Sequence, residues 1–313
     1  MIAELDARTA PESTLAALQL VETEADPHDF GEPARPFAEA IASYRNPGSA
    51  RRRHWLATED DEPAGAAALS RYGGSLVVGS VMVRPSFRRR GIGRSLFDAV
   101  VAAARADEVR SFFGEHSTPE GAAFARAIGA VDDQQHLVSV LDLRTAELPM
   151  PAPPEGVELR SWLGATPDEL LASFVRARNA MADAPVPGGQ EMPVWTNTEQ
   201  RRDEERQIAR GTPQLVTVAV AEGEVLALTG IRLPDAVSAR IAHTDDTATV
   251  PHARRRGLAL AVKLENLRAL RAARPGIERV ATQNAAHNEA ILAVNREVGF
   301  VPVLTLTTAV VTL

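Results

Sequence analysis

The sequence predicts a mixed α/β fold in two tandem halves, with helices on both faces of each mixed sheet. Three observations support this fold class. Helix-like and strand-like segments alternate along all 313 residues, the second half repeats the element order of the first, and a proline-rich stretch separates the two. We therefore expect an N-terminal domain over 1–146, a linker over 147–156 and a C-terminal domain over 157–313.

The first half has two helical segments, at 11–23 and 33–45, followed by apolar strand-like segments at 54–60, 63–71 and 74–83. Gly91 opens a predicted helix over 91–106. A strand over 108–114, a helix over 119–130 and a strand over 136–143 complete this half. The expected order is β-α-α-β-β-β-α-β-α-β.

The stretch "ELPMPAPPEG", 147–156, contains four prolines. Proline removes a backbone donor and fixes φ, so this stretch favours extended linker geometry over a helix or a central strand.

The second half begins with a predicted strand over 156–163. A helix over 166–183 has a Thr/Asp start signal, and a polar helix over 197–211 ends at Gly211. Two strands within 214–233 flank a Glu-Gly turn, and a third covers 238–250. A helix over 257–273, a strand over 278–284, a helix over 287–299 and a strand-like tail over 300–313 repeat the order of the first half.

Composition excludes several functional classes. The chain has no cysteine, which excludes a disulfide, a thiolate nucleophile and a cysteine metal site. Its seven histidines have no ligand spacing, so we expect no metal. A net charge of −7 disfavours nucleic acid. No apolar run approaches the roughly 18 residues of a membrane span, and no signal-peptide core is present. We expect a cytoplasmic protein without membrane contact; its oligomeric state remains open.

Two loops share one pattern. "PSFRRRGIGRSLF" (85–97) and "PHARRRGLALAVK" (251–263) each lie between a predicted strand and a predicted helix. A glycine-containing turn at a helix N-terminus directs backbone N–H groups at one point, which suits a phosphate. Neither loop is a nucleotide P-loop. Charged turns that only cap helices are the structural alternative, and a nucleic-acid patch fits less well because stacking aromatics are missing.

The order Arg-x-x-Gly-x-Gly/Ala resembles the acetyl-CoA pyrophosphate loop of the GNAT acetyltransferase superfamily. The matching residues are Arg88, Gly91 and Gly93 in the first half, and Arg254, Gly257 and Ala259 in the second. Asn288 and the sequence Val298-Gly299-Phe300 resemble the family's Asn…Gly-Phe element. The whole chain is similar to a tandem GNAT protein, of the branch that includes mycothiol synthases.

This resemblance implies acetyl-CoA as cofactor and a primary amine of a small molecule as acceptor. The implied cofactor contacts are Thr249, Val250, Arg254, Arg255, Arg256, Gly257, Leu258, Ala259, Asn284 and Asn288 in the second half, and Val83, Arg88, Arg89, Arg90, Gly91, Ile92, Gly93 and Arg94 in the first.

GNAT enzymes often carry the general base on their fourth strand. Counting back by two from the second loop lists Thr249, Thr247, Asp245 and His243 on one face of 238–250, whereas the first half lists Val83, Val81, Gly79 and Val77. We therefore expect catalysis in the C-terminal domain and a structural N-terminal domain. Asp245 is the leading base, followed by His243 and by Asp246, which a bulge would bring to the same face. A solvated aspartate pair and a structural histidine are the alternatives.

Many GNAT enzymes place a tyrosine, as acid to the thiolate, at the position held here by Asn295. An amide can donate a hydrogen bond but not a proton, so Asn295 is a candidate thiolate contact or only a helix–pantetheine contact. The long loop near 179–195 predicts acceptor residues Asp183, Glu191 and Trp195, with a core role as the alternative for Trp195.

Two other functions remain open: a non-catalytic acyl-CoA-binding regulatory protein, and a protein N-terminal or lysine acetyltransferase. Acetyl-CoA binding without thiol release would favour the first, and activity that requires a peptide would favour the second.

Overall fold

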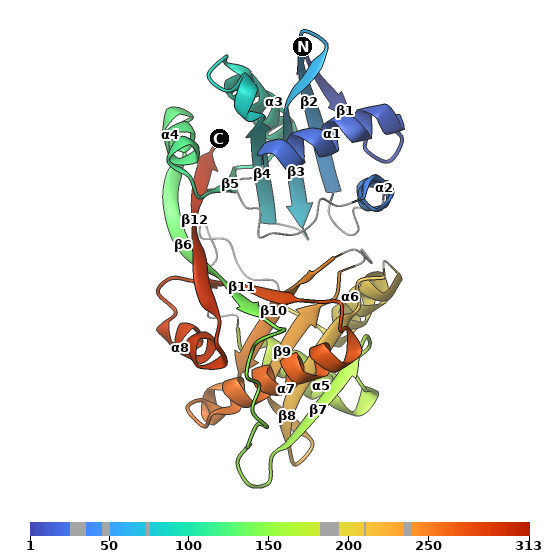
Figure 1. Cartoon of the computed structure of the whole chain (residues 1–313), viewed down its shortest axis with the longest axis vertical. Helices are drawn as coiled ribbons and strands as arrows, with labels where there is room; N and C mark the ends of the chain where they lie inside the picture. The colour runs from blue at the N-terminus through green and yellow to red at the C-terminus, as the bar shows by residue number, and fades with distance from the viewer. Residues whose placement is uncertain (26–35, 46–50, 73–75, 182–193, 210, 235–238) are drawn as a thin grey trace. The chain divides into compact units, whose positions relative to one another are not determined.

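A computed structural model of the chain describes residues 1–25, 36–45, 51–72, 76–181, 194–209, 211–234 and 239–313. The chain forms two compact units, each a sheet covered by helices (Figure 1). The first holds Met1–Gln135 and Leu306–Leu313, and the second holds the described part of His136–Thr305. The predicted mixed α/β fold is confirmed.

The first unit follows the predicted element order. Its elements are β1 (Ile2–Leu5), α1 (Glu12–Ala25), α2 (Phe37–Arg45), β2 (Arg51–Glu59), β3 (Glu62–Tyr72), β4 (Leu76–Val83), α3 (Ile92–Ala106), β5 (Ser111–His116) and α4 (Pro119–Ala127), with the start of β6 (Val131–Asp142). Apolar residues of α3, among them Leu96 and Val100, pack on one sheet face with Trp55. Leu18 and Val21 of α1 pack on the other face with Leu56.

The second unit repeats this order with β7 (Glu158–Leu163), α5 (Asp168–Asn179), α6 (Asn197–Ala209), β8 (Gln214–Ala221), β9 (Glu224–Arg232), β10 (Ile241–Thr249), α7 (Leu258–Ala273), β11 (Arg279–Ala285), α8 (Glu289–Val298) and the start of β12 (Val301–Thr312). Leu170 and Phe174 of α5 pack on one face of the sheet. Leu264 and Leu267 of α7 pack on the other.

The last strand of each sequence half joins the sheet of the other half. In the first unit, Thr307–Thr312 of β12 pairs antiparallel with Ser111–His116 of β5. In the second unit, His136–Asp142 of β6 pairs antiparallel with Arg279–Ala285 of β11. The predicted division at 147–156 therefore separates the halves of the sequence, whereas the packing units exchange their final strands.

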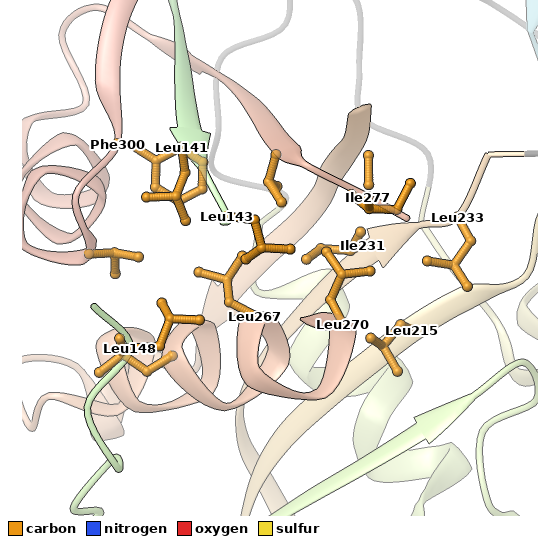
Figure 2. Packing of buried hydrophobic residues seen from close by; sticks show 14 residues of the cluster. Leu141, Leu143, Leu148, Leu215, Ile231, Leu233, Leu267, Leu270, Ile277 and Phe300 are labelled. Carbon is orange, nitrogen blue, oxygen red and sulfur yellow. The ribbon is translucent and has the colours of Figure 1, made fainter. Parts of the chain in front are cut away.

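The exchanged strand contributes to the core of the second unit. Leu141 of β6 and Leu143 just after it are 3% and 1% exposed. They pack in one cluster with Leu267 and Leu270 of α7 and with Phe300 (Figure 2). Burial of two leucines at this position makes β6 a structural part of the second unit.

Lys263 on α7, the chain's one lysine, is buried at 3% exposure with its Nζ atom 5.3 Å from the centre of the Phe300 ring. Burial lowers the pKa of Lys263 from 10.5 to about 8. The folded protein therefore holds this proton more weakly than the unfolded chain, so the charged lysine opposes folding at neutral pH. That penalty disappears as pH rises from 8 toward 10.5.

Lys263→Met is expected to raise the free energy of unfolding at pH 7 by about 3 kcal/mol, the equivalent of the pKa difference. Urea unfolding between pH 6 and pH 10.5 measures it. The advantage of the variant should shrink at high pH, where the wild-type lysine folds as the neutral amine. Lys263→Arg, which keeps the charge, serves as the control. Equal stability of wild type and Lys263→Met at pH 7 would contradict the prediction.

Candidate functional site

The two arginine–glycine loops have the same backbone conformation. Each begins with a short 3₁₀ turn, Pro85–Phe87 and Pro251–Ala253. The middle arginine of each triplet has a positive φ, 65° and 62°, and the glycine that caps each helix has φ of 84° and 73°. A positive φ is costly for arginine but not for glycine. Because the strained conformation occurs in both units, the shape of the loop is a property of the repeat.

The helix behind each loop begins with Gly91 or Gly257 as its N-cap. The first backbone N–H groups of a helix have no acceptor within the helix, and the helix dipole is positive there. A Cβ atom built on Gly257 or Gly91 would meet no other atom within 4 Å. Each loop therefore offers an open approach to backbone donors, which is the geometry that binds phosphate.

Two of the predicted loop arginines form hydrogen bonds to the strand end before their own loop, and the other predicted residues differ in their exposure. The Nε atoms of Arg88 and Arg254 donate back to the strand ends, to Val83 O at 3.1 Å and Thr249 O at 3.2 Å. Other predicted residues lie as follows: Arg90 pairs with Glu59 and Arg94 with Asp98, Leu258 is buried, Ile92 and Gly93 are partly buried, and Arg89, Arg255 and Arg256 are exposed.

The backbone N–H of Val250 donates to Leu226 O, so this predicted contact is engaged within the sheet. Ala259 takes the place that Gly93 has in the first unit, where a Cβ would lie 3.3 Å from the Phe124 ring. The two loops thus have matching backbones and different local packing.

Strand β10 contains a bulge that β4 does not have. Thr244 pairs with Ile231 and Thr247 pairs with Thr229, so β10 advances three residues while β9 advances two. Asp245 and Asp246 therefore both lie opposite Gly230. In contrast, the pairing of β3 with β4 runs without a shift from Gly65–Val83 to Tyr72–Leu76.

The bulge interrupts the simple alternation that would align His243, Asp245, Thr247 and Thr249. Thr247 exchanges a 2.8 Å hydrogen bond with Thr229, whereas Asp245 and Asp246 reach other partners. His243 is exposed and is the last residue of β10 that pairs with β11.

Both carboxylates are held by side chains from other elements. Gln214 Nε2 of β8 donates to Asp245 Oδ2 at 2.9 Å, and Arg232 Nη2 donates to the same oxygen at 2.5 Å. Arg178 Nε of α5 donates to Asp246 Oδ2 at 2.7 Å. The side chains of the two aspartates are 26% and 24% exposed, so solvent reaches an otherwise enclosed pair.

The electrostatic environment favours the protonated form of Asp245. Burial is the largest cause and raises the pKa of its carboxyl above the ordinary 3.8; Arg232 opposes this shift and Asp246 adds to it. A carboxylate with a raised pKa, fixed by two donors and partly open to solvent, is suited to accept a proton.

Gly230 makes room for the contact between Gln214 and Asp245. A Cβ at Gly230 would lie 2.6 Å from Gln214 Nε2 and 2.8 Å from Gln214 Cδ. Gly230→Ala is therefore expected to displace the Gln214 amide and to raise the pKa of Asp245 further, because the charged form loses a donor. A ¹³C NMR titration of the aspartate carboxyls measures this. Gln214→Leu should give a shift of the same sign, and an unchanged Asp245 titration in both variants would contradict this role.

The residues that hold the aspartates were not among the predicted site residues. Arg178 also donates from Nη1 to Gln200 Oε1 at 2.8 Å, and its guanidinium lies 3.6 Å from the centre of the Trp195 ring. The side-chain amide of Asn179 donates to the backbone oxygen of Trp195 and accepts from the backbone N–H of Trp195, at 2.9 Å each. A glycine inside a strand signals a bulge or a close approach of another group. Gly230 was therefore the sequence feature that could have indicated the residues around the two aspartates. The predicted residues Asp183 and Glu191 lie outside the described residues.

Strands β10 and β11 separate next to the bulge. Their parallel pairing runs from Ile241–Arg279 to His243–Ala281, after which β10 continues along β9 and β11 along β6. Among the described residues of the first unit, β4 and β5 form a single such pair, Val78–Phe113. In the second unit, the separation lies directly beside the aspartates.

The predicted asparagines lie around the end of β11. Asn295 is 2% exposed; its Nδ2 donates to Asn284 Oδ1 at 2.7 Å, and its own Oδ1 is buried without a partner among the described residues. Asn288 caps α8 by accepting from Ile291 N. An unsatisfied buried oxygen near the separated strands fits a ligand that brings an N–H donor.

The described part of the chain holds no group of three or more His, Asp or Glu side chains arranged for a metal ion. Among the same residues, none of the helices is both long and apolar enough to cross a membrane.

Known proteins resemble this chain in sequence. The model of the acetyltransferase (GNAT) family matches residues 17–128, in the first half. The mycothiol acetyltransferase of Salinispora tropica is 34% identical over 226 residues, which cover 70% of this chain and 67% of the relative. Those of Nocardia farcinica and Clavibacter sepedonicus are 33% and 38% identical, over 49% and 39% of their lengths. The chain thus spans only about two fifths to half of those two relatives.

Solved structures resemble it over its whole length. A tandem GNAT protein from the clavulanic acid biosynthesis pathway is 25% identical, with a TM-score of 0.79 over 100% of this chain and 98% of that one. A GCN5-related N-acetyltransferase from Sphaerobacter thermophilus has a TM-score of 0.77 at 14% identity over 99% and 95% of the two chains, a likeness of fold alone.

Proposed function

Because this chain belongs to the GNAT acetyltransferase family, as a tandem member, we propose that it acetylates a primary amine of a small molecule, with the chemistry in its second unit. The observation that carries this proposal is the β10 bulge, with Asp245 held by Gln214 and Arg232 at the point where β10 and β11 separate. The unbulged β4 of the first unit offers no carboxylate at the matching place.

Acetyl-CoA, the cofactor of the family, supplies the acetyl group as an activated thioester. Its fit is supported by the open approach to the Gly257 backbone and by the buried, unpartnered Asn295 Oδ1. We assign the phosphates to the N–H groups at Gly257, Leu258 and Ala259 and to the exposed Arg255 and Arg256. Thr249, Val250, Asn284 and Asn288 remain proposed contacts, as do the matching residues of the first loop.

Asp245 is proposed as the general base. The pKa of Asp245 is raised and so lies closer to the pKa of an ammonium group than the pKa of an ordinary aspartate does. Proton transfer from the acceptor's ammonium group to Asp245 is therefore less unfavourable. Both hydrogen bonds end on Oδ2. The proton therefore goes to Oδ1, directly or through one water. His243 is the second candidate, since it is exposed at the end of the β10–β11 pairing.

Asn295 is proposed as a positioning residue. Its Nδ2 already donates a hydrogen bond to Asn284 Oδ1, and Thr282 Oγ1 donates to the same oxygen at 3.3 Å. An amide in this arrangement orients Asn284 and supplies no proton. We therefore assign no protein acid to the departing sulfur and expect water to protonate it.

The acceptor is proposed to lie on the side of Asp246 and Arg178. The names of the curated relatives favour a small-molecule acceptor. Trp195 stacks on Arg178, and Arg178 donates a hydrogen bond to Asp246. The proposed role of Trp195 is therefore to position Arg178. This arrangement leaves Asp245 as the proposed carboxylate for the amine and Asp246 as the neighbouring carboxylate that Arg178 holds.

A thiol-release assay with acetyl-CoA and a panel of primary amines tests the proposal. Release that depends on a small amine and is lost in Arg254→Ala supports it. Saturable acetyl-CoA binding without release for any amine would favour a regulatory acyl-CoA-binding protein instead. Release that requires a peptide would favour a protein acetyltransferase. Calorimetry of Arg88→Ala and Arg254→Ala assigns each bound acetyl-CoA to one unit.

A further inference from the structure

The first unit contains a hollow at the end of its sheet that the proposed function does not use. Its walls carry charged side chains from β2, from β3 and from the end of α3: Arg51, Arg53, Arg71 and Asp107. Its floor consists of three buried apolar residues: Leu69, Val77 and Val109. The empty volume is about 260 Å³ and includes space open to solvent. A hollow with an apolar floor and basic walls suits a small organic anion.

The strand register brings the three arginines together. Arg51 and Arg53 are two residues apart on β2, so their side chains leave the sheet on the same face. Arg71 of β3 pairs directly opposite Arg51. Like charges directly opposite one another in a sheet are destabilising. An anion bound between Arg51 and Arg71 would remove this repulsion.

The acidic groups nearby neutralise only part of this positive charge. Glu4 accepts from Arg53 Nε and Nη2 at 2.7 and 2.9 Å, and Asp107 Oδ2 lies 3.6 Å from Arg53 Nη1. Arg71 Nη2 donates to the backbone oxygen of Asp107 at 3.0 Å. Among the described residues, neither Arg51 nor Arg71 forms an ion pair. Three arginines beside two carboxylates leave one positive charge in excess, which matches a ligand with a single negative charge.

The internal repeat shows that the fold does not require arginine at these positions. Counting from the register shift in each of the equivalent hairpins, β2–β3 and β8–β9, Arg53 corresponds to Leu215. By the same count, Arg71 corresponds to Leu233. Both leucines are buried in the core of the second unit, at 5% and 1% exposure (Figure 2). Burial of leucine is stabilising, so the arginines of the first unit forgo this gain at a place where a basic hollow results.

We propose that this hollow binds a small aliphatic monocarboxylate, whose carboxylate accepts hydrogen bonds from Arg51 and Arg71 and whose hydrocarbon part lies on the apolar floor. The planar guanidinium group matches the two oxygens of a carboxylate. The hollow is separate from the arginine–glycine loop of this unit. It adjoins Val77 near the start of β4, whereas the loop follows Val83, about 20 Å further along the strand. Its floor belongs to the core under α3, on the sheet face opposite α1.

Methyl NMR of the full-length chain tests this proposal without an activity assay. Butyrate is titrated at pH 7 and constant ionic strength in the absence of acetyl-CoA, and the methyl signals of Leu69, Val77 and Val109 should shift saturably. Propylamine carries the same propyl group with the opposite charge, so it should not move these signals. Inorganic phosphate should bind more weakly, because it has no hydrocarbon part. Equal affinities for phosphate and butyrate would overturn the assignment to an aliphatic carboxylate.

Arg51→Gln and Arg71→Leu should each weaken butyrate binding by about tenfold or more, the effect of losing a hydrogen bond to a charged group. Arg71→Leu introduces the residue found at the equivalent position of the second unit. Arg51 is exposed, so Arg51→Gln keeps the test decisive if Arg71→Leu proves unstable. Arg126→Leu removes an exposed arginine of α4 in the same unit and is the matched control, with unchanged affinity. Methyl signals that do not move with butyrate, or equal affinities of Arg51→Gln and Arg126→Leu, would overturn the proposal.

Discussion

Asp245→Asn is expected to lower kcat/KM for amine acetylation by about two to four orders of magnitude, the usual contribution of a positioned general base. The amide keeps the shape and can still contact Gln214 and Arg232, but it cannot accept the proton of the ammonium. Steady-state thiol release over a range of amine concentrations, at saturating acetyl-CoA, measures the loss. Asp168→Asn, on an exposed surface of the same unit, is the control and should retain full activity.

The pH dependence of kcat/KM in the wild type should also show that Asp245 acts as the base. The carboxylate is active only when deprotonated, so kcat/KM should fall as pH decreases through an apparent pKa above 3.8, the direction given by the burial of Asp245. Asp245→Asn should lose this acidic limb. If Asp245→Asn retains wild-type kcat/KM and His243→Ala does not, the base is His243.

Removal of residues 1–146 is expected to abolish folding of the remaining half. The fragment 147–313 lacks β6, which pairs with β11 from Asp142–Arg279 to His136–Ala285. It also lacks Leu141 and Leu143, and loss of a buried leucine costs about 2–5 kcal/mol each, against a typical total stability of 5–15 kcal/mol. The dispersion of the amide NMR spectrum and cooperative thermal unfolding measure the result.

The matched fragment 136–313 restores the part of β6 that pairs with β11, His136–Asp142, and should regain a dispersed spectrum. It remains without most of the first unit, so recovery would assign the effect to this one strand. Cooperative unfolding of 147–313 at the same temperature as 136–313 would show that β6 is dispensable.

Most of the fold follows from sequence patterns that act locally. The predicted helix over 257–273 and the observed Leu258–Ala273 differ by one residue, because the cap at Gly257 is a local signal. The predicted strand over 136–143 was too short, since the polar start of Val131–Asp142 hides its alternation. The pattern of this strand also does not specify its sheet, because pairing with β11 depends on a partner far along the chain.

The candidate site was less predictable for the same physical reason. The sequence indicated the aspartate pair, yet which carboxylate faces which partner depends on one inserted residue in β10. Arg178 and Gln214 lie 67 and 31 residues before Asp245 in the sequence and are brought there only by tertiary packing. The proposed role of Asp245 therefore rests on contacts between strands and helices, and no sequence motif contains it.

The exchange of final strands also constrains how such a gene can change. After a duplication, one copy can normally drift or be lost while the other keeps its activity. Here Leu141 is encoded in the first copy but is buried in the product of the second, and Val311 is encoded in the second but packs in the first. Each copy therefore contributes buried residues to the other, so a copy without activity of its own would still be retained for the stability of its neighbour.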